Sequence, residues 1–295
     1  MSSLKYEYDE ILKQIYLEKG NGFYDDDFSY SSKYPHYFKK HILENLLDGM
    51  NSTTRKAYMA GAGKEFEEKN GRPPKFLSIG SSSLFCYLAL STDCADDKEG
   101  ADYFTIGDDK IDKVEFEKKL KVLPGNANPP HMDAYAKTKN REYFFECKCH
   151  EMFDKHNIRL SKKYFSTNKD LVVNYIPQEY LIDNGKFYAV DSNAFGIENS
   201  AFDIKQFLTH LMGIKCNMQK NEAQFIYFYC LPPKNLIRNN KILDICQKAI
   251  NDANTLFKSD IISNYCNNNG IKLSLYVYDG PAVYAASKDN VTRII

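Results

Sequence analysis

The chain of 295 residues has no tryptophan, no excess charge of either sign and no long apolar run. Lysine and arginine number 39, as do aspartate and glutamate, so the formal net charge is zero. This balance argues against a polycation that coats nucleic acid through bulk charge, although it leaves a local basic surface open. Because no stretch reaches about 18 consecutive apolar residues, no membrane span is expected. The length and composition instead indicate a folded protein with a buried core.

Signals for export are also missing. The first ten residues, MSSLKYEYDE, lack the basic segment and the following apolar segment of a secretory signal, so we expect a cytoplasmic protein. The eight cysteines are scattered, and most lie in apolar runs such as FIYFYC. In a reducing cytosol we expect them to be free thiols.

The spacing of apolar residues predicts helices in the first third of the chain. Residues 1–75 are expected to form a helical N-terminal extension that packs on a main domain of residues 76–295. The predicted helices cover 4–18, 37–50, 55–69 and a short segment that begins at 81–83. For this short segment, a strand is nearly as good an interpretation.

Strand-like segments follow, separated by turns rich in glycine, proline and asparagine. The order of elements predicts an α/β fold, with a mixed central β-sheet that contains an antiparallel meander and is flanked by helices. The predicted strands cover 101–106, 113–123, 131–138, 142–149, 224–231 and 272–278, and two further helices cover 203–219 and 241–257.

Charge is unevenly distributed along this order. Residues 91–117 hold ten acidic residues and three lysines, whereas residues 203–293 hold eleven lysines and arginines against seven acidic residues. The neutral total therefore combines an acidic segment with a mildly basic one.

The segment PPHMDAYAKTKNREYFFECKCHE, residues 129–151, has the most informative chemistry. Alternation along a strand places Glu146 and Lys148 on one face and Cys147 on the other. A tight turn at 138–140 would pair this strand with the preceding one and bring Asp133 close to Glu146.

Two carboxylates and a lysine on one face have a clear use. Asp133 and Glu146 can hold Mg²⁺, or Mn²⁺ in its place, and the main-chain carbonyl of Cys147 can add a ligand. Lys148 can stabilise developing charge or act on the attacking water. The alternative is a cross-strand ion pair on a solvated face. An ion pair inside a strand as apolar as YFFEC favours the catalytic interpretation.

These residues resemble the signature of the PD-(D/E)xK nuclease superfamily, which has the restriction-endonuclease-like fold. Asp133, preceded by Pro129-Pro130, is similar to the first half of the signature, and Glu146-Cys147-Lys148 is similar to the second. The sequence from Glu146 to Glu151 is similar to a bacterial branch that reads E-S-K-F-T-E. That branch also has a Phe-Glu pair on the preceding strand, matched here by Phe116-Glu117.

Farther along the chain, Gln206 and His210 match a helix of this branch that carries Gln and His four residues apart. The resemblance spans roughly residues 80–235. It implies a Mg²⁺-dependent endodeoxyribonuclease of the restriction or defence type, with DNA as its partner. It also implies site residues, which are Asp133, Glu146, Lys148 and Gln206 for catalysis and Asp133, Glu146, Glu117 and Cys147 for the metal.

Other functions stay open at this point. A nuclease-like fold can serve as a non-catalytic module that binds nucleic acid or protein. A sugar hydrolase with two acidic residues would not need Lys148. Double-strand cleavage would favour a homodimer, on which the sequence is silent.

Overall fold

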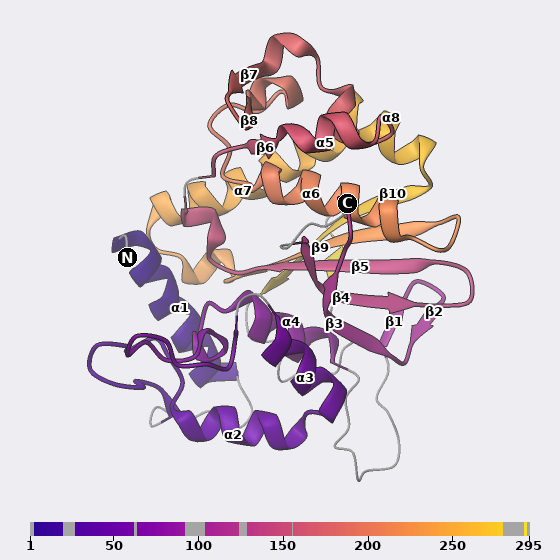
Figure 1. The fold of residues 1–295 in the computed structure, drawn as a ribbon. Coiled ribbons are helices and arrows are strands. Elements are labelled where there is room, and N and C mark those ends of the chain that lie inside the picture. The colour runs from indigo at the N-terminus through magenta and orange to yellow at the C-terminus, as the bar shows by residue number, and fades with distance from the viewer. Residues whose placement is uncertain are drawn as a thin grey trace.

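A six-stranded mixed sheet forms the centre of the computed structural model, which describes residues 3–19, 27–61, 64–91, 104–123, 129–154, 156–279 and 292–293 (Figure 1). Its strand order is β11-β10-β9-β5-β4-β3. The strands are β3 (Val114–Lys119), β4 (His131–Lys137), β5 (Glu142–Lys148), β9 (Ala223–Leu231), β10 (Ile271–Asp279) and the two-residue β11 (Thr292–Arg293). Strands β3, β4 and β5 form an antiparallel meander, and β9 runs parallel to both β5 and β10. The predicted fold class is therefore confirmed.

Helices cover both faces of this sheet (Figure 1). On one face lie α3 (Ser52–Ala60) and α4 (Ser82–Leu90), and on the other lie α6 (Ile204–Asn217), α7 (Asn240–Lys258) and α8 (Asp260–Asn268). Strands β5 and β9 are buried at every position. Parallel strands covered on both faces are expected to be near-continuous apolar runs, as the sequence FIYFYCL of β9 is.

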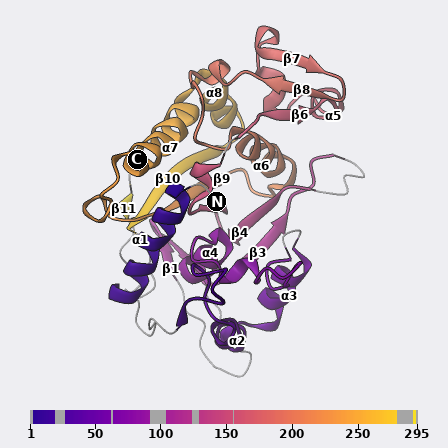
Figure 2. The same cartoon turned by 90° about the vertical axis from the view of Figure 1, so that its left-hand side faces the viewer.

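The first helix, α1 (Ser3–Lys19), lies beside the carboxyl ends of β5 and β9, where its Tyr8 hydroxyl contacts the Cys149 and Cys230 carbonyls (Figure 2). Its Tyr8, Leu12, Ile15 and Tyr16 are buried in the same continuous core as the sheet. The second helix, α2 (Lys40–Gly49), buries Ile42 and Leu43.

A small lobe stands apart from the main sheet, at the top of Figure 1. It contains a three-stranded sheet of order β6-β8-β7 and the short helix α5 (Lys162–Thr167). Its strands are β6 (Arg159–Ser161), β7 (Leu181–Asn184) and β8 (Phe187–Val190). A separate hairpin joins β1 (Phe104–Ile106) to β2 (Asp109–Ile111). The strands of the lobe are only three or four residues long and were not predicted from the sequence.

The structure decides the length of one predicted helix and the type of another predicted element. The helix predicted over 55–69 ends at Ala60, because the backbone turns to an extended conformation at Gly61. Glu65 and Glu68, which fall within the predicted range, therefore lie beyond the helix, and the predicted end of this helix was wrong. The segment after Ser81 is a helix and not a strand, and the Ser81 hydroxyl caps it by accepting from the Leu84 N–H.

The cysteines that the structure describes are all free thiols, as predicted, and Cys216 is the exposed one among them. Cys94 and residues 101–103 of a predicted strand lie outside the described residues. Within the described ranges, no helix combines the length and apolar character needed to cross a membrane.

Candidate active site

The ladder between β4 and β5 opens where the predicted acidic residues lie. Its last pair is Ala134–Phe145, and beyond it the Asp133 side chain replaces a backbone partner, with its Oδ2 accepting from the Cys147 N–H at 2.7 Å. The N–H and C=O of one strand residue point to the same side. The Cys147 carbonyl therefore also faces the opening beside Asp133, while its thiol lies buried on the opposite face from Glu146.

Glu146, Lys148 and Gln206 form a closed triangle of hydrogen bonds. Oε1 of Glu146 accepts from Lys148 Nζ at 2.6 Å and from Gln206 Nε2 at 2.8 Å. Lys148 Nζ also donates to Gln206 Oε1 at 2.7 Å. The Asp203 carboxylate caps the start of α6 by accepting from the Gln206 N–H at 2.9 Å, which holds Gln206 in place.

The second carboxylate oxygen of Glu146 has no hydrogen-bond partner, although it is buried. Nδ1 of His210 lies 3.3 Å from it and also lacks a hydrogen bond. Burial lowers the pKa of His210 to about 3. The imidazole is therefore neutral, and its contact with Glu146 is not an ion pair. An orphaned buried carboxylate oxygen is costly and calls for an explanation.

Burial dominates the electrostatics of the site. It raises the pKa of Glu146 to about 7, although the Lys148 ammonium acts in the opposite direction. Burial and then Glu146 raise the pKa of Asp133 well above its usual value. For Lys148, burial favours the neutral amine, but Glu146, Glu151 and Asp133 outweigh it, so its pKa is raised. Lys148 therefore keeps its proton while Glu146 titrates near neutral pH.

Glu117 lies on β3 at the level of Asp133. Its φ of 52° is in the left-handed region, and the β3–β4 ladder skips it between Phe116 and Lys118. Its Oε2 lies 3.3 Å from His131 Nδ1 and packs so closely on Gly61 that a Cβ there would stand 2.8 Å away. Its charge contributes to the raised pKa of Asp133. In the part of the chain that the structure describes, no three His, Cys, Asp or Glu side chains converge as a ready-made metal site.

A second set of contacts ties the ends of β5 and α6 together. The Glu151 carboxylate accepts from the Cys149 N–H at 2.7 Å, just past the end of β5. His156 lies 3.0 Å from the Glu151 carbonyl through Nε2 and 3.4 Å from Asp203 through Nδ1. Lys148 and Gln206 are thus anchored from both sides.

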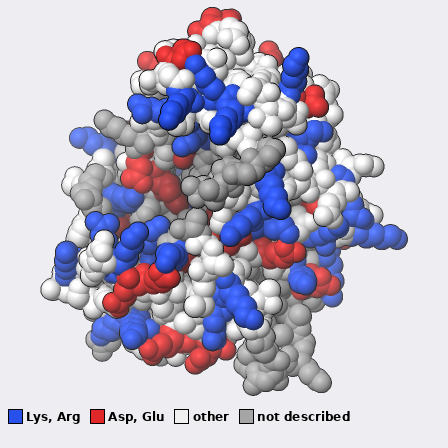
Figure 3. All heavy atoms as spheres, viewed as in Figure 1, with Lys and Arg blue, Asp and Glu red and all other residues white. Residues whose placement is uncertain are grey.

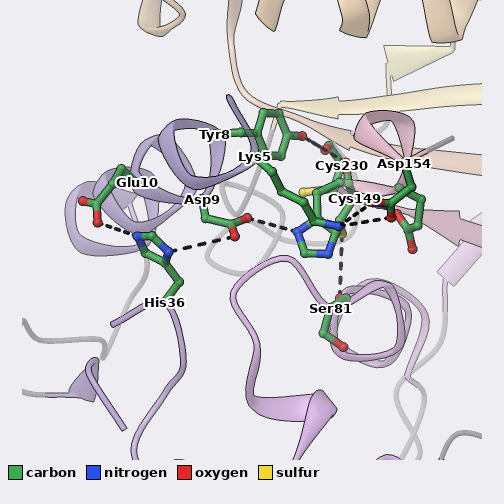
Figure 4. Close-up of polar contacts among 11 residues, drawn as sticks. Lys5, Tyr8, Asp9, Glu10, His36, Ser81, Cys149, Asp154 and Cys230 are labelled. Atoms are coloured by element: carbon green, nitrogen blue, oxygen red, sulfur yellow. Dashed lines mark hydrogen bonds and ion pairs between the residues drawn. The ribbon is translucent and has the colours of Figure 1, made fainter. Parts of the chain in front are cut away.

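Helix α1 braces the end of β5. The Tyr8 hydroxyl lies 2.7 Å from the Cys230 carbonyl on β9 and 3.2 Å from the Cys149 carbonyl. Figure 4 shows Asp9 between His36 and the end of β5, with Glu10 on the other side of His36. One oxygen of buried Asp9 lies 3.1 Å from Nδ1 of His150. The N-terminal helix therefore supports the strand that carries Glu146 and Lys148.

This bracing predicts a stability effect. Tyr8→Phe is expected to lower the free energy of unfolding by about 1–3 kcal/mol, because it leaves buried carbonyl oxygens without their donor. Tyr6→Phe is the matched control, since Tyr6 is 47% exposed and keeps its ring contact with His36. Urea denaturation measures both variants, and equal stabilities would contradict the bracing role.

The molecular surface around these elements is mixed in charge. Figure 3 shows acidic side chains gathered left of centre, with lysine and arginine side chains spread over much of the same face. Basic side chains also gather near the top of this view, over β6 and α5. No uniform basic surface covers this face.

The structure thus places Asp133, Glu146, Lys148, Gln206 and the Cys147 carbonyl around one opening of the sheet, with Glu117 on the next strand. Sequence reasoning missed Tyr8, Asp9, His156 and Asp203. A signal for Asp203 existed, because Asp three residues before Gln at the start of an apolar helix is a capping pattern. Comparisons with protein-family models, curated proteins and solved structures find no match to this chain.

Proposed function

We propose that this protein is a Mg²⁺-dependent endodeoxyribonuclease, of the restriction or defence type. The observation that carries the proposal is the buried Glu146–Lys148–Gln206 triangle, which leaves one Glu146 oxygen without a hydrogen bond on the strand next to that of Asp133. An ion pair on a solvated face, the alternative in the sequence analysis, is not buried in this way.

The donor set fits a magnesium ion. Asp133 Oδ1, Glu146 Oε2 and the Cys147 carbonyl are oxygen donors, which Mg²⁺ prefers, and Glu117 is a further carboxylate on the adjoining strand. When bound, the ion would neutralise charge on a phosphodiester and lower the pKa of a bound water. The raised pKa values of Asp133 and Glu146, on two neighbouring strands, are also typical of functional sites.

Lys148 and Gln206 have distinct roles in this proposal. Because Lys148 keeps its proton, we assign it to stabilising negative charge on the phosphodiester, not to accepting a proton from water. Gln206 holds the lysine and Glu146 in position through its two amide contacts.

The test is metal-dependent DNA cleavage. The purified protein is expected to cleave plasmid DNA with Mg²⁺ or Mn²⁺ and to lose this activity with a chelator. Calorimetric titration with Mg²⁺ distinguishes the nuclease from the main alternative, a non-catalytic binding module. The degenerate site of such a module would bind no metal. No cleavage of a varied DNA panel together with no Mg²⁺ binding would exclude the nuclease.

A further inference from the structure

The small lobe described above is inserted between two parts of the candidate active site. The chain enters it after Glu151, just beyond Lys148, and leaves it at Asp203, which caps the helix of Gln206. His156 joins the two ends through its contacts with the Glu151 carbonyl and Asp203. The base of the lobe is therefore part of the wall of the site.

The two faces of the lobe's sheet differ sharply. The inner face carries Leu160, Tyr188 and Val190, and the Tyr188 ring packs on Phe165 of α5 with centroids 4.9 Å apart. The strand register places Ile182 opposite Ala189 and Asn184 opposite Phe187 on the outer face. On this outer face Ile182, Asn184 and Phe187 are exposed and Ala189 is half-buried.

Large hydrophobic side chains are exposed on the outer face. Ile182 is 61% exposed and Phe187 is 45% exposed, and they are two of the five most exposed large hydrophobic residues in the described ranges. A two-residue turn, Gly185-Lys186, joins their strands, and its tightness requires the φ of 64° that Gly185 adopts. The hairpin thus presents two apolar side chains on a short projection.

Two basic residues accompany Ile182 and Phe187, one on the same face of the sheet and one in the turn. Arg159 is exposed and shares the outer face, since it lies opposite Ala189 in the register. Lys186 in the turn is exposed as well. Asp183 on β7 is paired with Lys162, so its charge is offset. Apolar residues framed by arginine and lysine are suited to a duplex, in which phosphates flank a groove of stacked bases.

From this arrangement we infer that the β7–β8 hairpin is a DNA-contacting element of the proposed nuclease. Arg159 and Lys186 contact phosphates, and Phe187 and Ile182 enter a groove against the bases. This inference rests on the proposed function, because it names the part of the chain that holds the substrate of that site.

The test measures binding of a labelled short duplex by full-length protein without divalent metal, by fluorescence anisotropy at several salt concentrations. The double variant Ile182→Ala/Phe187→Ala is expected to weaken binding by about 10-fold or more. Arg159→Gln and Lys186→Gln are each expected to lower the slope of log affinity against log salt by about 1. Met59→Ala and Lys258→Gln are matched controls, because both residues are exposed and lie on α3 and α7, outside the three-stranded sheet of the lobe.

Cleavage assays with Mg²⁺ separate this inference from the proposed function. The double variant should raise KM for DNA while its hydrolysis of bis(p-nitrophenyl) phosphate, a substrate too small to reach the hairpin, stays unchanged. If the wild type cleaves DNA and the double variant binds as tightly as the wild type, the hairpin role is overturned alone. If the double variant binds DNA more weakly than the wild type but the wild type shows no Mg²⁺-dependent cleavage, the DNA-contacting role of the hairpin is supported and the proposed nuclease activity is refuted. A wild-type dimer that the double variant dissociates, with DNA affinity unchanged, would assign the face to contact between copies.

Discussion

Lys148→Met is expected to lower the rate of DNA cleavage by about 10³-fold, with little change in affinity for DNA. The substitution removes one preorganised charge from the site, and removing one such donor commonly lowers catalysis by this order. Lys148 Nζ lies 2.6 Å from Glu146 Oε1 and 2.7 Å from Gln206 Oε1. Another lysine could replace this ammonium only if Glu146 and Gln206 shifted from these positions. Initial rates with saturating DNA and Mg²⁺ measure the effect.

Loss of folding must be separated from loss of chemistry in this experiment. Removing Lys148 leaves Glu146 buried without its charged partner, which typically costs roughly 3–5 kcal/mol. The double variant Glu146→Gln/Lys148→Met removes both charges and should regain much of this stability while staying inactive. Lys258→Met, a change at an exposed lysine, should behave like the wild type. A folded Lys148→Met protein that cleaves DNA within a few-fold of the wild-type rate would refute the assigned role.

Glu146→Gln is expected to become more stable relative to the wild type as pH rises. Burial raises the folded-state pKa of Glu146 to about 7 from its usual 4.5, so the folded protein binds more protons than the unfolded chain between these values. The Glu146 contribution to stability is therefore fully present below about pH 4.5 and is lost as pH rises through about 7. At about 1.4 kcal/mol for each pH unit, the change is about 3 kcal/mol.

Urea denaturation at several pH values measures the difference in unfolding free energy between the wild type and Glu146→Gln. The same measurement in the presence of Mg²⁺ gives a second test. A cation at the site favours the ionised carboxylate, so Mg²⁺ should stabilise the wild type more at pH 8 than at pH 5 and should stabilise Glu146→Gln little at either pH. A stability difference between the two proteins that does not vary with pH would show that Glu146 does not titrate in this range.

The sequence predicted the main architecture because its elements have strong periodicity. Apolar residues every three to four positions mark α6 and α7, and the uninterrupted apolar run of β9 marks a strand covered on both faces. The strands of the lobe are too short to show a period, so β6, β7 and β8 were missed. The helix predicted over 55–69 ends at Ala60, and the next residue, Gly61, packs against Glu117 on a distant strand, a contact that has no local signal in the sequence.

The sequence by itself determined which side chains share a face. Strand alternation is local, so it places Glu146 with Lys148 and apart from Cys147 without knowledge of the fold. What only the tertiary structure decided is how those charges behave. The pKa of Glu146, its orphaned oxygen and the bracing by Tyr8 and Asp9 all depend on burial and on partners from α6 and α1, far away in the sequence. Desolvation and long-range contacts have no local signature, because they arise only when distant segments exclude water from the same place.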